Sequence, residues 1–167
     1  METCFIPNRD VRGFVAANAD ATGPGLKEGP IRDRSGKELG RHTGLASYTI
    51  GQRSGLGLSG TEPRYVVRID AAANAVIVGG VDELQTTVIT VGALTWNGKR
   101  NGEALRAEVR IRHRHTPALA RIEFGQNHTA TIYFDEPQRA PAPGQAAVIY
   151  AGDEVLGGGT ILRGGGA

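Results

Sequence analysis

Residues 105–117 read LRAEVRIRHRHTP, and polar and apolar side chains alternate along most of this stretch. Side chains two positions apart lie on the same face of a β-strand. The stretch therefore predicts a strand over residues 105–114 that has one basic face and one apolar face, with two histidines at its exit. The basic face holds Arg106, Arg110, Arg112 and Arg114, the apolar face holds Leu105, Ala107, Val109 and Ile111, and the histidines are His113 and His115.

Further strand-like segments surround this one at short spacing in the second half of the chain. Five or six short strands in a stretch of about 80 residues predict a small antiparallel barrel or a sandwich. Three consecutive glycines at 157–159 indicate a bulge or a close approach of two backbones. The other expected strands are residues 87–91, 118–124, 128–134, 145–150 and 153–162.

The first half of the chain predicts a separate β-rich unit that ends near residues 80–86. Asn8 is placed to cap a short helix, and residues 16–28 lose the helical pattern and predict a loop. Turn-forming residues inside 29–42 and 64–80 predict two hairpins.

The segment 48–60, YTIGQRSGLGLSG, is too rich in glycine for a regular element and too apolar for a free linker. It lacks the lysine and the closing G-K-[ST] of a nucleotide-binding loop. One interpretation is a tight turn that packs its backbone against another domain. The other is a loop whose Gln52 and Arg53 contact an RNA backbone.

The composition excludes several classes of protein. Of the 167 residues 40% are hydrophobic, which is enough for a packed core. A single cysteine excludes an internal disulfide and a zinc site built from cysteines. No apolar run is long enough to span a membrane, so we expect a soluble, cytoplasmic protein with no membrane partner. We predict no metal site.

Charge is unevenly distributed, although the net charge is only +2. Between residues 105 and 121 there are five arginines and one acid, Glu108. Arginine binds phosphate through two parallel hydrogen bonds and stacks on bases, so the run favours a nucleic-acid surface. The alternative is a solvated edge strand whose charges discourage aggregation. Asp135 and Glu136 precede a proline and are interpreted as turn residues.

Cys4 is the single cysteine of the chain and could act as a nucleophile or carry sulfur. Both roles require a lowered thiol pKa and access to solvent, and no residue near Cys4 in the sequence provides activation. The alternative is a small buried apolar residue beside Phe5 and Ile6. The sequence contains no complete active site by itself.

Several motifs together resemble one family, the tRNA-specific 2-thiouridylases (MnmA/TrmU). The resemblance extends over nearly the whole chain and is most specific in YTIGQR and in the closing motif. In chain order the motifs are CFIP, GPIRDRSGKELGRHTGLASYTIGQRSGLGL, YVVRID with NAVIVGG, VRIRHRHTP and FDEPQRAPAPGQAAVIYAGDEVLGGGTI.

The resemblance implies a mainly β fold. It implies that residues 1–7 end a catalytic linker, that 8–82 form a central β-rich domain, and that 83–167 form an antiparallel six-stranded β-barrel like those of translation factors. Family members begin with an ATP-pyrophosphatase domain that binds ATP with magnesium. Its SGGxDS-type loop and the first catalytic cysteine do not occur in this chain.

The resemblance also implies roles for particular residues. Cys4 matches the second catalytic cysteine, which accepts sulfur from a sulfur-carrier protein as a persulfide and delivers it to the wobble uridine of tRNAs for Lys, Glu and Gln. Arg112 and His113 match a tRNA-contacting pair whose second member is often tyrosine, and Gln145 matches another tRNA contact. Strand geometry adds Arg110 and Arg114.

Three functions are therefore considered. The first is the tRNA-binding and sulfur-relay portion of a thiouridylase, which is inactive alone. The second is a standalone RNA-binding module in which Cys4 is structural. The third is a methyltransferase, for which the sequence offers no glycine-rich strand–helix turn.

Overall fold

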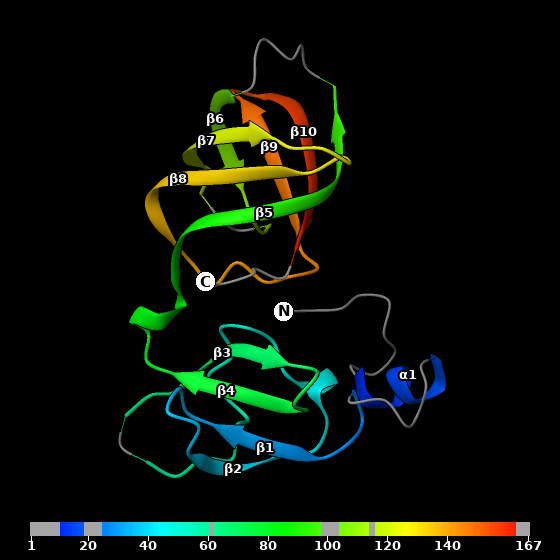
Figure 1. The fold of residues 1–167 in the computed structure, drawn as a ribbon, viewed down its shortest axis with the longest axis vertical. Coiled ribbons are helices and arrows are strands. Elements are labelled where there is room, and N and C mark those ends of the chain that lie inside the picture. Colours follow the sequence, from blue (N-terminus) through cyan, green and yellow to red (C-terminus); the bar gives the residue numbers. More distant parts are fainter. Residues whose placement is uncertain (1–10, 19–24, 61, 98–103, 114–115, 163–167) are drawn as a thin grey trace. The chain divides into compact units, whose positions relative to one another are not determined.

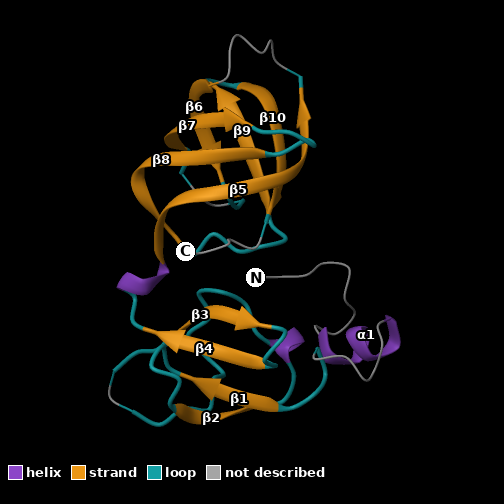
Figure 2. Cartoon of the chain, in the orientation of Figure 1, coloured by secondary structure: helices purple, strands orange, loops and turns teal. Residues whose placement is uncertain are grey.

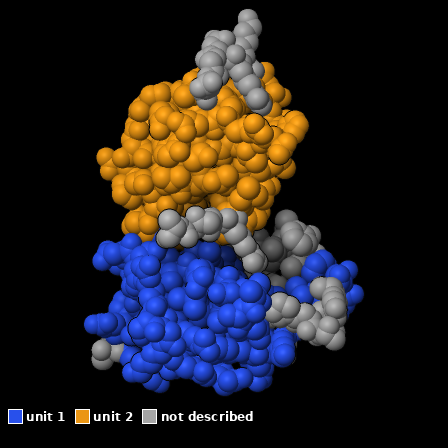
Figure 3. Space-filling model, viewed as in Figure 1, with its two compact units in different colours: residues 1–84 blue, residues 85–167 orange. Residues whose placement is uncertain are grey.

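The structure is a computed structural model that describes residues 11–18, 25–60, 62–97, 104–113 and 116–162. Strands predominate over helices in these ranges, which confirms the predicted mainly β class (Figure 2). The chain divides into two compact units, residues 1–84 and 85–167, which Figure 3 shows in different colours. Among the described residues, no helix has the length and apolar character that crossing a membrane requires.

The first unit contains a four-stranded mixed sheet in the order β2-β1-β4-β3 (Figure 1). Neighbouring strands are antiparallel except β1 and β4, which are parallel. The predicted helix is present as α1 and extends to Asn18, so the loop expected from residue 16 begins later. The expected cap, Asn8, lies outside the described residues. The elements are α1 (Val11–Asn18), β1 (Gly29–Arg32), β2 (Glu38–His42), β3 (Tyr65–Asp70) and β4 (Ala75–Gly79), with short 3-10 helices η2 (Leu45–Ser47) and η3 (Asp82–Leu84).

An aspartate closes the hairpin between β1 and β2. The hydroxyl of Ser35 donates to the Asp33 carboxylate at 2.6 Å, and the N–H of Lys37 donates to the same oxygen at 3.1 Å. The Ser35 hydrogen bond is the main reason that the pKa of Asp33 lies below its usual value. Gly36 has a φ of 88°, a left-handed conformation that glycine adopts without strain.

A buried histidine stabilises the edge of this sheet. His42 is 1% exposed, and the N–H of Gly44 donates to its Nδ1 at 3.1 Å. Nδ1 is therefore unprotonated, so that Nε2 carries the proton and donates to the Asn74 carbonyl at 3.0 Å. The hydrophobic core beside it contains Ile31, Leu45, Leu56, Val66, Val76 and Val78.

The second unit is a closed barrel of six strands in the order β10-β5-β8-β7-β6-β9. Every neighbouring pair is antiparallel, which confirms the six-stranded antiparallel barrel. The strands are β5 (Gln85–Trp96), β6 (Ala104–Arg110), β7 (Ala118–Phe124), β8 (Ala130–Arg139), β9 (Ala146–Ala151) and β10 (Glu154–Ile161).

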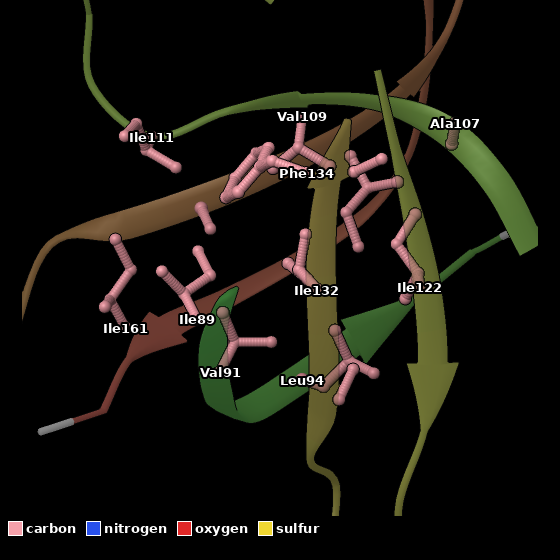
Figure 4. Close-up of a cluster of buried hydrophobic side chains, with 14 residues drawn as sticks. Ile89, Val91, Leu94, Ala107, Val109, Ile111, Ile122, Ile132, Phe134 and Ile161 are labelled. Carbon is pink, nitrogen blue, oxygen red and sulfur yellow. The ribbon is translucent and has the colours of Figure 1, made fainter. Parts of the chain in front are cut away.

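Branched apolar side chains from all around the barrel fill its interior (Figure 4). Val91, Val109, Ile122, Ile132 and Ile149 are each 0% exposed. They come from β5, β6, β7, β8 and β9, so each of these strands contributes to one shared core. The apolar face predicted for residues 105–111 is part of that core.

The three consecutive glycines lie in β10, where neighbouring backbones leave no room for a side chain. A Cβ on Gly157 would lie 2.5 Å from the carbonyl oxygen of Thr95, and a Cβ on Gly158 would lie 2.8 Å from that of Ala147. The pairing register of β10 also shifts, against β9 between Val155 and Gly157 and against β5 between Gly158 and Thr160. Both features expected at residues 157–159, a bulge and a close backbone approach, are therefore present.

Two local expectations were wrong. The predicted strand 105–114 ends at Arg110, and a bend at Arg112 and a turn at His113 follow it. Asp135 and Glu136 lie inside β8 and do not form a turn. Pro137 is tolerated there because the register with β5 is irregular beyond Thr86, so its missing N–H breaks no regular ladder.

Candidate nucleic-acid interface

The antiparallel barrel brings alternate strand ends together. Because neighbours run in opposite directions, β6, β8 and β10 finish at the end where β5, β7 and β9 begin. We call this the basic end; the turns at 125–129 and 152–153 lie at the opposite end. Arg110 pairs with Val148 near the start of β9, and Arg139 pairs with Gln85 at the start of β5.

Arg112 and His113 leave the barrel wall directly after β6. Ile111 is buried in the core, and Arg112 and His113 beyond it are exposed. Arg112 donates from Nη2 to the Arg139 carbonyl at 3.1 Å, which ties the exit of β6 to the end of β8. In a regular strand His113 would point away from the side of Arg112. The bend removes that restriction, so both side chains reach solvent at the basic end.

Gln145 belongs to the same end because it directly precedes β9. Its N–H donates to the Ala142 carbonyl at 3.1 Å, and its own carbonyl accepts from the N–H of Ile161 at 2.8 Å. Gly144 adopts a φ of 86° and donates to the Ile161 carbonyl at 2.8 Å. The backbone of this loop is thereby fixed to the end of β10, with the Gln145 side chain half-buried.

Arg110 is held at the surface by an aromatic ring. Its guanidinium carbon lies 5.5 Å from the centre of the Tyr150 ring, within range of a cation–π contact. Its Nε is buried and has no hydrogen-bond partner among the described residues. The stacked ring limits the conformations of the guanidinium and leaves its outer nitrogens available for a ligand.

Two arginines on the barrel wall have acidic partners. Arg106 pairs with Asp135 at 2.5 Å, and Arg121 pairs with Glu123. Within the described ranges, no carboxylate lies at ion-pair distance from Arg110 or Arg112. Among the described arginines of the expected row, Arg106 is therefore neutralised, whereas Arg110 and Arg112 are not.

The closed barrel also rules out the alternative interpretation of this strand. β6 pairs with β7 on one side and with β9 on the other, so it is not an edge strand. Charges that discourage edge-to-edge aggregation are needed only where a strand has an open side. Protection of an open edge is therefore not the reason for the arginines at the end of β6.

The structure brings together four of the six predicted site residues: Arg110, Arg112, His113 and Gln145. Arg114 and Cys4 lie outside the described residues. Arg139, whose carbonyl accepts from Arg112, was not among the predicted residues, because the segment before it was interpreted as a turn and not as part of a strand.

For Gln52, the structure favours the tight-turn interpretation over the RNA contact. Its Oε1 accepts from the Thr49 N–H at 3.0 Å, and its Nε2 donates to the Ser54 carbonyl at 3.0 Å. Its side chain thus closes a turn. Among the described residues, no group of three or more His, Cys, Asp or Glu side chains is placed to hold a metal ion.

Comparison with known proteins first gives the class of domain. Residues 23–80 match the family model described as "tRNA methyl transferase PRC-barrel domain". Residues 86–161 match the model described as "Aminomethyltransferase beta-barrel domain". Both matches are to barrel domains, and each falls within one of the two compact units.

Individual relatives give the family. The tRNA-specific 2-thiouridylase MnmA of Acidobacterium capsulatum is 44% identical over 96% of this chain and 45% of its own length. The tRNA-specific 2-thiouridylase MnmA of Chloroflexus aggregans is 44% identical over 97% of this chain and 45% of its own length. That of Syntrophotalea carbinolica is 43% identical over 96% of this chain and 45% of its own length. The chain belongs to the tRNA-specific 2-thiouridylase family and corresponds to the C-terminal part of its members. It spans less than half the length of these curated relatives.

Proposed function

We propose that this chain is the tRNA-binding and sulfur-relay portion of a cytoplasmic tRNA 2-thiouridylase. The complete enzyme converts the wobble uridine, position 34 of the tRNA, to 2-thiouridine with ATP and a persulfide. The substrates are tRNAs for Lys, Glu and Gln, and the chain alone does not catalyse the reaction.

The observation that carries the RNA-binding part is the uncompensated charge at the basic end. Arg110 and Arg112 stand there without an acidic partner among the described residues, while Arg106 and Arg121 on the wall of the same barrel are paired. A polyanion gains most from cations that no carboxylate already neutralises. Exposed His113 and half-buried Gln145 add groups that can stack on or hydrogen-bond to nucleotides.

The sulfur-relay part rests on Cys4 within TCFIP, which resembles the second catalytic cysteine of the family. A sulfur-carrier protein would load Cys4 as a persulfide. The terminal sulfur would form a bond to C2 of the uracil as the activated oxygen leaves. The first cysteine of the complete enzyme would then attack Sγ of Cys4, forming a disulfide and releasing 2-thiouridine. That disulfide must be reduced before another turnover.

The residues of this chain do not fit an ATP site. The glycine-rich segment 48–60 has neither the lysine nor the G-K-[ST] of a nucleotide-binding loop. The described residues also contain no group of three or more His, Cys, Asp or Glu side chains placed to hold a metal ion. Within the proposal, ATP is bound by the other part of the enzyme.

The RNA-binding part is tested by the salt dependence of tRNA binding to the 167-residue chain. We expect Arg112→Gln to weaken binding and to flatten the slope of log K against log salt by about 0.7 to 0.9, the value for one lost phosphate contact. Arg106→Gln is the matched control, because its charge is already paired with Asp135. Equal effects of the two substitutions would place the RNA elsewhere.

The sulfur-relay part is tested in the complete enzyme with Cys4→Ser. We expect thiolation of tRNA, measured by mass spectrometry of nucleosides, to be abolished while tRNA binding is retained. Thiolation that survives this substitution would favour the second function considered, a standalone RNA-binding module with a structural cysteine.

A further inference from the structure

An open hollow of about 230 Å³ lies in the first unit and not in the barrel that carries the basic end. Its lining comes entirely from residues between Arg53 and Arg64, in the loop that leads into β3. Figure 2 draws this connection, between η2 and β3, as loop. The start of the loop is anchored on β3, because Gly51 donates to the Val66 carbonyl at 2.8 Å and Val66 donates to the Gln52 carbonyl at 2.9 Å.

Leucines and glycines have separate roles in this loop. Leu56 is buried in the core of the first unit, and half-buried Leu58 packs against it. Gly55 and Gly57 are exposed and have φ values of 75° and 64°. A Cβ on Gly57 would meet no atom within 4 Å, so the backbone conformation requires glycine there and packing does not. The leucines thus hold an exposed, bare backbone in a defined conformation.

The backbone N–H groups of residues 53–60 are the next feature of this loop. Within the described part of the chain, no carbonyl or side chain accepts a hydrogen bond from an N–H of residues 53–60. Loops with left-handed residues and several unpaired N–H groups form concavities that bind anions. Glycine also lets an anion approach the backbone closely, because no Cβ stands in its way.

The charged side chains of the lining agree with an anion. Arg53 is exposed and Arg64 is half-buried, and neither lies at ion-pair distance from a carboxylate among the described residues. Glu62 is the one acid in the lining, so the positive side chains exceed the negative ones. Asp33, which is not part of the lining, is close enough for its negative charge to interact with that of Arg64.

We propose that this hollow binds a phosphate group of the RNA backbone, as a second RNA contact on the first unit. The assignment to RNA rests on the proposed function, whereas the anion site rests on the loop alone. Arg53 and Arg64 would hold the phosphate oxygens, and the N–H groups around Gly55 and Gly57 would donate to them. Free phosphate has the same chemistry, so the experiment distinguishes the two sources.

The anion site is tested by titrating the ¹⁵N-labelled 167-residue chain with inorganic phosphate, with potassium chloride at equal ionic strength as reference. We expect the amide resonances of Gly55 and Gly57 to shift more than that of Gly36. Gly36 is a matched control, because it is also left-handed and exposed but its N–H already donates to the Asp33 carbonyl at 3.0 Å. Shifts no larger than those of Gly36 would overturn the site.

The RNA occupant is tested with Arg53→Gln/Arg64→Gln and an unmodified tRNA transcript. We expect binding to weaken about fivefold or more and the salt slope to flatten by about 0.7 to 0.9. Arg41→Gln is the control, since Arg41 lies in β2 of the same unit and pairs with Glu38 at 3.6 Å. Wild-type affinity and slope in the double variant would overturn the RNA assignment, even if phosphate shifts the glycines.

The two proposals fail in different ways. A wild-type chain that does not bind tRNA would refute the proposed function and, with it, the RNA occupant; the phosphate titration would still test the anion site. If Arg112→Gln weakens binding and the double variant does not, the basic end is supported and the hollow is not an RNA contact.

Discussion

Gly157→Ala should destabilise the barrel strongly, because the new methyl group has no space. The Cβ would lie 2.5 Å from the Thr95 carbonyl oxygen and 2.7 Å from Cε3 of Trp96. Ordinary contact begins at 3.4 Å, so the first distance is too short by 0.9 Å. The clash is with backbone of the paired strand β5, which cannot rotate away as the end of a flexible side chain could.

The magnitude follows from the position of the clash. Overpacking a well-packed site typically costs about 1 to 3 kcal/mol, and we expect about 3 kcal/mol here because two hydrogen-bonded strands must separate. For a unit of this size each kcal/mol lowers Tm by about 4 to 8 °C, so the expected decrease is about 12 to 24 °C.

Trp96 provides a readout that is confined to the barrel. It is the single tryptophan of the chain, and its ring stacks edge-on against Phe124 with a centroid distance of 4.8 Å. Its fluorescence should report unfolding of residues 85–167 on heating. Thr160→Ala is the control, since Thr160 is exposed on the same strand and should change stability by less than about 0.5 kcal/mol. A Tm of Gly157→Ala equal to that of the control would refute the close-approach reasoning.

Three further predictions concern stability. His42→Ala should lower the free energy of unfolding by about 2 to 4 kcal/mol, because it leaves a cavity and removes the donor to the Asn74 carbonyl. Amide hydrogen exchange in the first sheet should become faster, and unchanged exchange would contradict the prediction. Ser35→Ala should be less stable than wild type at neutral pH. Because the pKa of Asp33 is lowered in the folded state, the difference in stability between Ser35→Ala and wild type should disappear as the pH falls below 3.8 and through the folded-state pKa. Urea unfolding at several pH values measures this difference. A difference that does not depend on pH would be evidence against the role of the Ser35 hydrogen bond. Ile132→Ala should cost about 3 to 4 kcal/mol by Trp96 fluorescence, whereas Ile132→Val should cost about 1 kcal/mol; equal losses would argue against a tightly packed barrel interior.

Local patterns located each barrel strand but not all of the strand ends, because alternation and turn residues act over a few positions. The strand expected at 118–124 is β7 (Ala118–Phe124), and the run at 157–159 was correctly interpreted as a place of close backbone approach. Both inferences depend only on neighbours in the sequence. By contrast, the parallel pairing of β1 with β4 joins segments more than 40 residues apart and left no local signal.

The charge pattern shows the same limit. Arg106 was expected to share a phosphate-binding face with Arg110, but Asp135 of β8 neutralises it. That acid is 29 positions away in the sequence and becomes a neighbour only when the barrel closes. Similarly, alternation alone could not show that β6 ends at Arg110, because Arg112 and His113 continue the polar pattern without continuing the strand.

The most direct test of the central claim is hydrogen–deuterium exchange of the 167-residue chain with and without bound tRNA. If the basic end holds the RNA, peptides that cover residues 111–113 and 144–146 should become protected. The turns at 125–129 and 152–153, at the opposite end of the same barrel, should be unchanged. Protection of those turns, with none at the basic end, would contradict the account.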